Sequence, residues 1–183
     1  WTLVNVPVSL EDRDRTVVID AREAVRPTMT VDDPSAEAER GFYAVQYRRG
    51  DADYTIGGSW NARTASVLPV RQKGLTYLHG RAFLKAGSGW NSPSPYVYNV
   101  ADRRTNGIPS DPSYDVRKAD LAQVTTTYRG TVTAGRGEST SGAVLGDVHL
   151  GGWPNAVDLP SRVAEFYTPD PGVRWWREFS SAG

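Results

Sequence analysis

The chain has 183 residues, with 21 basic and 21 acidic side chains and no cysteine. The missing thiols exclude disulfides, thiol catalysis and thiolate metal sites together. The balanced charge gives no overall field that favours nucleic acid or an anionic membrane. There is also no apolar run of about 18 residues and no basic-then-apolar leader. We therefore expect no membrane span, no signal peptide in this stretch and no nucleic-acid partner.

Strand signals recur along the chain, separated by Gly, Pro, Asn, Asp and Ser. The longest is the clearest, because Leu78, Ala82 and Leu84 share one parity while His79 and Arg81 share the other. The predicted strands, in chain order, are Thr2–Val8, Thr16–Asp20, Thr28–Val31, Phe42–Arg49, Tyr54–Trp60, Thr64–Val70, Leu75–Ala86, Tyr96–Val100, Gln123–Thr133, Ala143–Leu150, Arg162–Thr168 and Val173–Phe179. This pattern predicts an all-β fold, an antiparallel β-sandwich of the jelly-roll or Ig-like kind.

Residues 32–39 are polar and acidic, and Pro34 disfavours a continuing central strand. We predict that residues 1–33 are either the end of a preceding small β-module or the first strands, and that residues 34–183 form the sandwich module. An ordinary connection within one domain explains the same stretch equally well. The chain starts at Trp1 in strand-like sequence without methionine, so we expect it to be cut from a larger polypeptide.

Other segments are predicted to be irregular. Residues 102–112 contain two prolines and an Asn-Gly pair, which indicate a loop, and residues 134–142, AGRGESTSG, are expected to be mobile. Single helical turns are predicted over Pro34–Arg40 and Arg117–Gln123.

The stretch Ser161–Phe179 has the signature of a β-hairpin. Two aromatic-bearing runs flank Pro169-Asp170-Pro171-Gly172, a turn sequence. On the return run, Val173, Trp175 and Phe179 share one parity and are expected to close the core.

Nucleophilic serine catalysis needs a serine, a base and a group that orients the base. Asp147 and His149 stand two apart in a predicted strand, and Ser139 or Ser141 precedes them. A triad can be drawn from these four residues. However, the serine segment lacks the Gly-x-Ser-x-Gly nucleophile elbow, and both His79 and His149 fall on predicted polar faces. No catalytic residue is therefore predicted, and these four stay as candidates.

Metal binding has little support, because no zinc-ligand spacing occurs. We expect no cofactor, although calcium stays open, since its oxygen ligands can come from scattered loops. The aspartates considered are Asp12, Asp14, Asp51, Asp53, Asp111 and Asp115. Ordinary turn formation by aspartate explains them as well.

Six tryptophans and nine tyrosines could build a surface that stacks on sugar rings or docks on a protein. Trp60, Trp90 and Trp153 lie beside turn-forming residues, and Trp176 falls on the mostly polar parity of its run. These four are the predicted binding residues. Core or strand-edge packing is the alternative, because large aromatics are usually buried.

Two phrases resemble the β-rich, non-catalytic carboxy-terminal regions of large secreted actinobacterial subtilisin-like serine peptidases. The first is Arg15–Ala24, RTVVIDAREA, and the second is Asp158–Pro169, DLPSRVAEFYTP, followed by GVRW. Gly107-Ile108-Pro109 and the run Asp115–Tyr128 also resemble stretches of these regions, and they occur in the same order along the chain. The Asp-Thr-Gly, His-Gly-Thr and Gly-Thr-Ser-Met-Ala motifs of the peptidases are absent, so no residue here inherits a catalytic role.

The resemblance implies an accessory β-sandwich module of a secreted, extracellular subtilase-like serine endopeptidase. Such a module would dock on the upstream peptidase domain of the same polypeptide or hold its substrate. Two alternatives stay open: a carbohydrate- or cell-wall-binding module that uses the turn-located tryptophans, and a small secreted serine hydrolase that uses Asp147, His149 and Ser139 or Ser141. A protein or polysaccharide ligand is compatible with the first two.

Overall fold

A computed structural model describes residues 2–6, 8, 14, 16–60, 65–89, 91–130 and 135–181. These residues form strands and two single-turn 3-10 helices, so the all-β prediction is confirmed. The strands are β1 (Thr2–Leu3), β2 (Thr28–Val31), β3 (Ala36–Arg49), β4 (Ala52–Trp60), β5 (Ser66–Val67), β6 (Val70–Lys85), β7 (Tyr96–Ile108), β8 (Ser113–Val116), β9 (Ala122–Tyr128), β10 (Gly135–Leu145), β11 (Val148–Leu159), β12 (Ser161–Tyr167) and β13 (Arg174–Ser181). The helices are η1 (Ala21–Glu23) and η2 (Lys118–Asp120).

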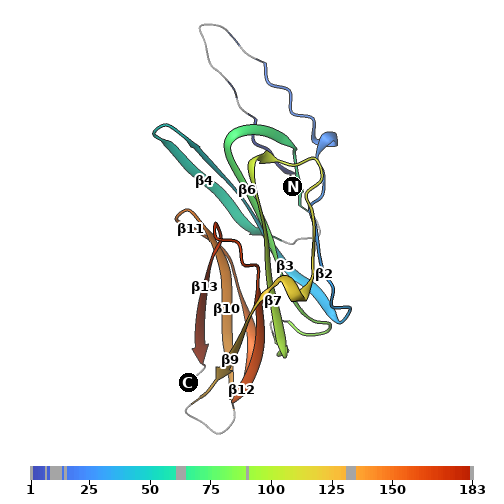
Figure 1. Cartoon of the computed structure of the whole chain (residues 1–183), viewed down its shortest axis with the longest axis vertical. Helices are drawn as coiled ribbons and strands as arrows, with labels where there is room; N and C mark the ends of the chain where they lie inside the picture. Colours follow the sequence, from blue (N-terminus) through green and yellow to red (C-terminus); the bar gives the residue numbers. More distant parts are fainter. Residues whose placement is uncertain are drawn as a thin grey trace.

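The strands form a sandwich of two main sheets (Figure 1). The larger sheet has the order β4-β3-β6-β7-β12-β9, and the sheet β11-β10-β13 packs on one of its faces. Two small sheets, β1-β5 and β2-β8, lie on the opposite face. Most neighbours are antiparallel, whereas β12–β7, β1–β5 and β2–β8 are parallel.

Alternate residues of the facing strands build the core between the two main sheets. Phe42 and Leu78 from the larger sheet pack with Ala143, Leu150 and Val173 from the other side. Leu78 is completely buried, and burial of a leucine side chain stabilises a fold by about 1.5–3 kcal/mol. The period-2 pattern of the sequence therefore places the inter-sheet core correctly.

The opposite face of the larger sheet is buried as well. Tyr77, His79 and Phe83 of β6 lie on this face, and the exposed fraction of His79 is 1%. The prediction that His79 stands on a polar, exposed face is therefore wrong. The reason is that β6 is a central strand with a layer on each side, so even its more polar parity is enclosed.

The two runs of the predicted hairpin belong to different sheets. β12 pairs with β7 and β9, whereas β13 pairs with β10. Residues 168–173 therefore cross between sheets. The crossing is held where Thr168 Oγ1 accepts a hydrogen bond from the Ala101 amide at 3.0 Å and Arg103 Nε pairs with Asp170 at 3.2 Å. Both predicted strands are present, but they do not pair with each other, so the hairpin prediction is wrong.

Several local predictions also need correction. The stretch expected as a mobile loop, residues 134–142, lies almost entirely in β10. Gly146, at φ +59°, turns the chain and splits the predicted strand Ala143–Leu150 in two. Residues 16–20 form no strand, β3 already begins at Ala36 in place of a helical turn, and β7 extends into the predicted loop 102–112.

The predictions for the return run and for the second helical turn have mixed outcomes. Val173 is buried, but Phe179 is 41% exposed and does not close the core. The predicted helical turn near Arg117 is confirmed as η2.

The described residues among the first 33 contribute β1 and β2, which pair with later parts of the chain. β1 pairs with β5, and β2 pairs with β8. The amide of Val25 also donates to the carbonyl of Val67 at 2.9 Å. This segment therefore lies on the sandwich formed by the residues that follow it.

Candidate functional site

Three of the four candidate catalytic residues lie on the faces of the β11-β10-β13 sheet, and the fourth lies in a turn at its end. Ser139 and Ser141 point inward, toward the larger sheet, where Ser141 Oγ donates to Asn99 Oδ1 at 2.8 Å. His149 is exposed on the outward side, opposite Val144 in the register. Asp147 is exposed in the turn between β10 and β11. The sheet itself separates the serines from the histidine, so this arrangement builds no triad.

Ser139 instead joins a buried network centred on Glu165, whose exposed fraction is 3%. Tyr128 donates its hydroxyl to Glu165 Oε1 at 2.7 Å, and Tyr167 donates to Oε2 at 2.6 Å. Ser139 Oγ lies 2.6 Å from the Tyr128 oxygen. Since the Tyr128 proton is directed to Glu165, Ser139 is the donor in this last bond. Each carboxylate oxygen thus has a hydroxyl donor.

Arg177 of β13 completes the network from the other sheet. Its Nη2 donates to Glu165 Oε1 at 3.0 Å and to Thr126 Oγ1 at 2.7 Å. Burial, together with the adjacent carboxylate, raises the pKa of Tyr167, and burial raises the pKa of Tyr128. Both phenols therefore stay protonated as donors. Because the hydrogen-bond partners of this buried carboxylate lie on both sheets, the network links the two sheets to each other inside the protein.

A small polar cavity lies beside this network, with a volume of about 10 Å³. Asn99, Ser141, Asn155 and Glu165 are among the residues that line it. The Asn99 Nδ2 group has no hydrogen-bond partner among the described residues. A polar void of this size holds a single water molecule at most, so it is too small for an organic substrate.

Sequence reasoning missed Glu165. The signal was available: a single charged residue shares the parity of Val163 and Tyr167 in an otherwise buried run. A charge at such a position indicates a buried partner network.

Trp176 lies on the outward face of the β11-β10-β13 sheet. Gly142 stands opposite it in the register, and Gly142 and Gly152 together form a floor beneath its ring. His149 lies next to it, with ring centroids 5.7 Å apart. The side chain is half-buried, and its Nε1 atom is covered and has no hydrogen-bond partner in the described part of the chain. An indole ring resting on glycines offers its other side as a flat apolar surface.

The two predicted binding tryptophans whose side chains are described, Trp153 and Trp176, lie on opposite faces of the β11-β10-β13 sheet. Trp153 faces inward and stacks on Phe42, with centroids 6.3 Å apart. Trp90 lies outside the described residues, and the side chain of Trp60 does too, although its backbone ends β4. Among the tryptophans predicted to bind, Trp176 is the described outward-facing one.

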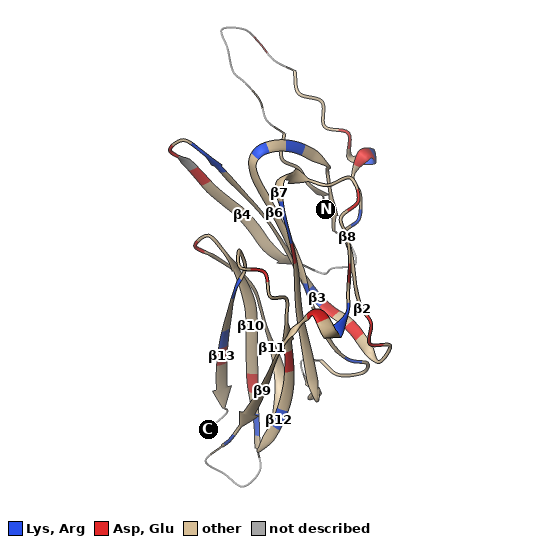
Figure 2. Cartoon of the chain, viewed as in Figure 1, with Lys and Arg blue, Asp and Glu red and all other residues tan. Residues whose placement is uncertain are grey.

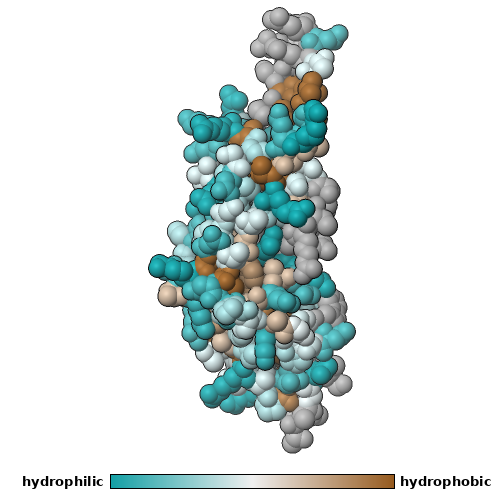
Figure 3. Space-filling view, turned by 90° about the vertical axis from the view of Figure 1, so that its right-hand side faces the viewer, coloured by the Kyte–Doolittle hydropathy of each residue, from teal (hydrophilic) through white to brown (hydrophobic). Residues whose placement is uncertain are grey.

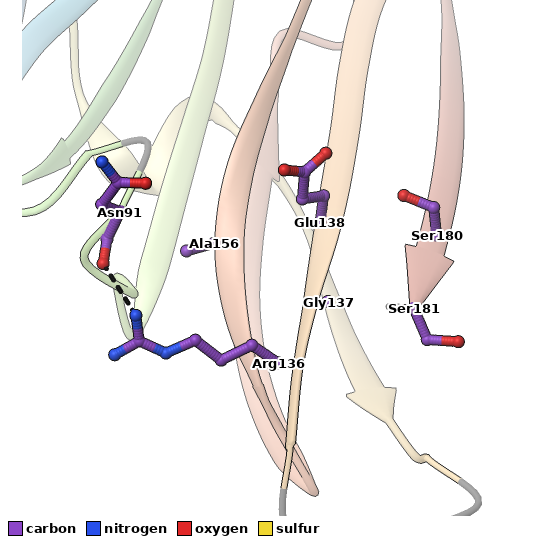
Figure 4. Close-up of a pocket in the computed structure, with 7 residues that line it drawn as sticks. All are labelled: Asn91, Arg136, Gly137, Glu138, Ala156, Ser180 and Ser181. Carbon is purple, nitrogen blue, oxygen red and sulfur yellow. Dashed lines mark hydrogen bonds between the residues drawn. The ribbon is translucent and has the colours of Figure 1, made fainter. Parts of the chain in front are cut away.

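A shallow pocket of about 370 Å³ lies farther along β10 (Figure 4). Arg136 and Glu138 are the charged residues of its described lining, and Arg136 Nη1 donates to the Asn91 carbonyl at 3.1 Å. The residues that line it are Asn91, Arg136, Gly137, Glu138, Ala156, Ser180 and Ser181. Among the described residues of this lining there is no aromatic ring and no histidine that could act as a base for Ser180 or Ser181.

A second buried polar cluster surrounds His79 on the opposite face of the larger sheet. The His79 ring lies between Tyr43 and Tyr77, with centroid distances of 6.3 and 5.4 Å. Among the described residues, neither ring nitrogen has a hydrogen-bond partner within ordinary distance and angle, although the nearby Thr28 backbone acts on the pKa of the ring. Asp102 Oδ2 is 4.0 Å from Nδ1 and accepts from Arg104 at 2.8 Å. Burial, aided by the nearby charges of Arg81 and Arg104, lowers the pKa of His79 to about 3. The imidazole is therefore neutral at physiological pH.

Three of the aspartates considered for calcium, Asp53, Asp111 and Asp115, have other partners. Asp53 accepts from Arg48 at 2.8 Å, Asp111 accepts from the Ser113 amide and Asp115 accepts from Thr30. Asp12 lies outside the described residues. Within the described part of the chain, no three potential ligands of the His, Cys, Asp and Glu types cluster together.

Comparison of the chain with protein-family models, curated proteins and solved structures finds no match. The resemblance to peptidase accessory regions therefore stays a prediction. Within the described residues, no helix is long and apolar enough to cross a membrane.

Proposed function

We propose that this chain is a non-catalytic accessory β-sandwich module of a secreted subtilisin-like serine peptidase, and that it works by docking on the catalytic domain. The family-like phrases support the peptidase assignment. The separation of Ser139 and Ser141 from His149 supports a module that binds without hydrolysing.

The observation that most supports docking is an exposed apolar segment between β1 and η1. Val17, Val18 and Ile19 are 42%, 82% and 54% exposed. Three consecutive β-branched residues with this exposure present an apolar surface that a partner can cover. Val6 and Val8, also exposed, belong to the same connection. Figure 3 shows hydrophobic atoms at this upper end of the molecule.

The segment also has the composition of a strand without a strand partner. Residues 16–20 lie in extended sequence rich in valine and isoleucine, yet no ladder includes them. Such a stretch can add to the sheet edge or apolar groove of a neighbouring domain, with backbone hydrogen bonds and alternating side chains. The proposed docking surface is therefore Val17-Val18-Ile19.

The test is isothermal titration calorimetry, in which the purified chain is titrated with a secreted actinobacterial subtilisin-like catalytic domain. We expect saturable binding that is weakened about tenfold or more in a Val18→Ser/Ile19→Ser variant, because both changes remove apolar contact area. Val124→Ser is the matched control, since Val124 is similarly exposed, at 41%, but lies on β9.

Two results would contradict the proposal. One is the absence of binding by the unmodified chain. The other is hydrolysis of casein or a peptide ester by the purified chain that is lost on His149→Ala, which would make the chain a hydrolase.

A carbohydrate- or cell-wall-binding module is the second candidate, favoured by the outward indole of Trp176 on its glycine floor. Its test is retention of the chain on insoluble chitin, cellulose and purified cell walls. Retention that is lost in Trp176→Ala but kept in Phe179→Ala supports this function, since Phe179 is an exposed aromatic that packs instead against Tyr128, 5.1 Å away. No retention on any of these materials discards it.

A further inference from the structure

The upper end of the larger sheet gathers basic side chains from three neighbouring strands. Arg48 and Arg49 end β3, Arg71 and Lys73 begin β6, and Arg104 lies near the end of β7. Figure 2 shows basic residues on the curve that opens β6 and on the β3–β4 hairpin, where acidic residues are present as well. In the sequence the basic residues look like scattered pairs in a chain of zero net charge; the strand order brings them together.

Two hollows lie among these residues and share Asn106. The larger has a volume of about 770 Å³ and the smaller about 410 Å³. The larger is lined by Tyr47, Arg48, Arg49, Gln72, Lys73, Gly74 and Asn106. The smaller is lined by Pro69, Val70, Arg71, Arg104, Thr105, Asn106, Gly107, Ile108, Pro109 and Ser110. No acidic residue is among the described residues that line either one. We call the two together the basic groove.

Three of the basic side chains have no ion-pair partner among the described residues. Arg49, Arg71 and Lys73 are exposed, and none forms an ion pair with another described residue. Arg48 pairs with Asp53 and Arg104 pairs with Asp102, so these two are already partly neutralised. Arg49, Arg71 and Lys73 therefore leave an excess of positive charge at the groove, which favours an anionic ligand.

The backbone is unusual at the point where the hollows meet. Asn106 has φ +64°, the one positive value recorded for a described residue other than glycine. Gly107 follows at φ +133°, and a Cβ there would stand 2.0 Å from the carbonyl of Val70. This left-handed turn leaves the Asn106 side chain exposed between the two hollows.

Tyr47 and Gln72 also line the larger hollow, and Tyr54 and Asn5 lie next to them. The ring of Tyr47 lies 5.6 Å from that of Tyr54, which is 40% exposed, so an aromatic pair borders the cations. The amides of Gln72 and Asn5 are bonded to each other at 2.8 Å, and Tyr54 donates to Asn5 at 3.1 Å. Guanidinium groups bind carboxylates through paired hydrogen bonds, and the partly exposed Tyr54 ring beside them offers an aromatic face to a sugar ring, so a carboxylated sugar matches both features.

We infer that the basic groove is a binding site for an acidic polysaccharide with uronate carboxylates, a function beyond docking on a peptidase. The carboxylates would pair with Arg49, Arg71 and Lys73, and the sugar rings would lie against Tyr47 and Tyr54. The groove belongs to the larger sheet and is separate from Trp176 on the smaller one.

The test is binding of the full chain to polygalacturonate, with dextran as the neutral probe and polyglutamate as the acidic-peptide probe. We expect binding to polygalacturonate that weakens as salt rises, and no binding to dextran. The variant Arg49→Ala/Lys73→Ala should bind about tenfold more weakly. The control Lys85→Ala/Arg162→Ala removes the same charge from exposed positions elsewhere and should bind as the unmodified chain does.

The inference is overturned by any of three results: no binding of polygalacturonate, an equal loss in both double variants, or equal affinity for polyglutamate. The last would assign the groove to acidic peptides. Because all four substituted side chains are exposed, the variants should fold, and unchanged circular dichroism checks this. Unaltered binding in Val18→Ser/Ile19→Ser separates this site from the proposed docking segment.

Discussion

Arg177 on β13 reaches across the sandwich to Glu165 on β12, with 3.0 Å between Nη2 and Oε1. The two strands belong to different sheets, and the carboxylate also accepts hydrogen bonds from Tyr128 and Tyr167. A buried carboxylate would weaken the fold if it were left without partners. Here its partners come from both sheets, so the polar network fixes how the sheets sit on one another.

Loss of this carboxylate should therefore be costly. We expect Glu165→Ala to lower the free energy of unfolding by about 3 kcal/mol, because it leaves two buried phenols and a guanidinium without their acceptor. Urea denaturation measures the change. Asp158→Asn, which breaks the exposed pair of Arg136 and Asp158 at 3.6 Å, is the control and should change stability by less than about 0.5 kcal/mol. A loss below that value in Glu165→Ala would contradict the structural role.

Acid should destabilise the protein through His79. Its pKa is about 3 in the folded chain and 6.5 for the unperturbed group, so the unfolded state binds the extra proton between these values. Stability is then fully present above pH 6.5 and falls by about 1.4 kcal/mol per pH unit below it. Between pH 6.5 and 5 this amounts to about 2 kcal/mol.

The variant His79→Phe isolates this effect, since it keeps a ring between Tyr43 and Tyr77 and removes the titration. Its loss of stability from pH 6.5 to 5 should be about 2 kcal/mol smaller than that of the unmodified chain. The exposed His149 supplies the control: His149→Gln should keep the steep dependence. Identical slopes in all three proteins would show that His79 is not buried as a neutral group.

The floor under Trp176 should not tolerate a methyl group. At Gly142 an added Cβ would stand 2.2 Å from the Leu150 carbonyl and 2.6 Å from Trp176 Nε1. We expect Gly142→Ala to lower the free energy of unfolding by about 2 kcal/mol or more and to change the near-ultraviolet circular dichroism of the indole. Gly89→Ala, whose Cβ would meet its nearest atom at 3.6 Å, should be close to neutral. Equal stability of the two variants would argue against the floor.

The inward serines should matter for stability and not for hydrolysis. Ser139→Ala removes the donor to the Tyr128 oxygen and should lower the free energy of unfolding by about 1 kcal/mol. The purified chain and this variant should both leave casein and peptide esters intact. Hydrolysis by the unmodified chain that disappears in Ser139→Ala would assign a catalytic role to this serine.

The parts of the fold that sequence could predict are those governed by local periodicity. β2 and the central part of β6 were predicted closely, because one parity of each is apolar and turn residues flank them. The same reasoning failed at β10, whose Gly- and Ser-rich first half looks like a loop. Its small residues are required there by the Trp176 ring on one side and by the Glu165 network on the other.

Which strands pair, and which side chains become buried, depends on distant parts of the chain. The turn Pro169–Gly172 is real, but local sequence does not show that it leads from one sheet to the other. Likewise, the polar parity of β6 would be exposed in a two-layer sandwich, and only the further layer of β1, β2, β5 and β8 buries His79. Of the candidate site, sequence identified Trp176 but not Glu165 or the basic groove, because each of these is assembled from several strands.

The most direct test of docking is amide hydrogen exchange of the full chain, alone and mixed with a secreted actinobacterial subtilisin-like catalytic domain. Residues 16–20 form no ladder, so their amides should exchange rapidly in the free chain. Docking through Val17-Val18-Ile19 predicts that they become protected in the mixture while the exposed edge strand β9 does not change. Rapid exchange of residues 16–20 in the presence of saturating catalytic domain would contradict the proposed function.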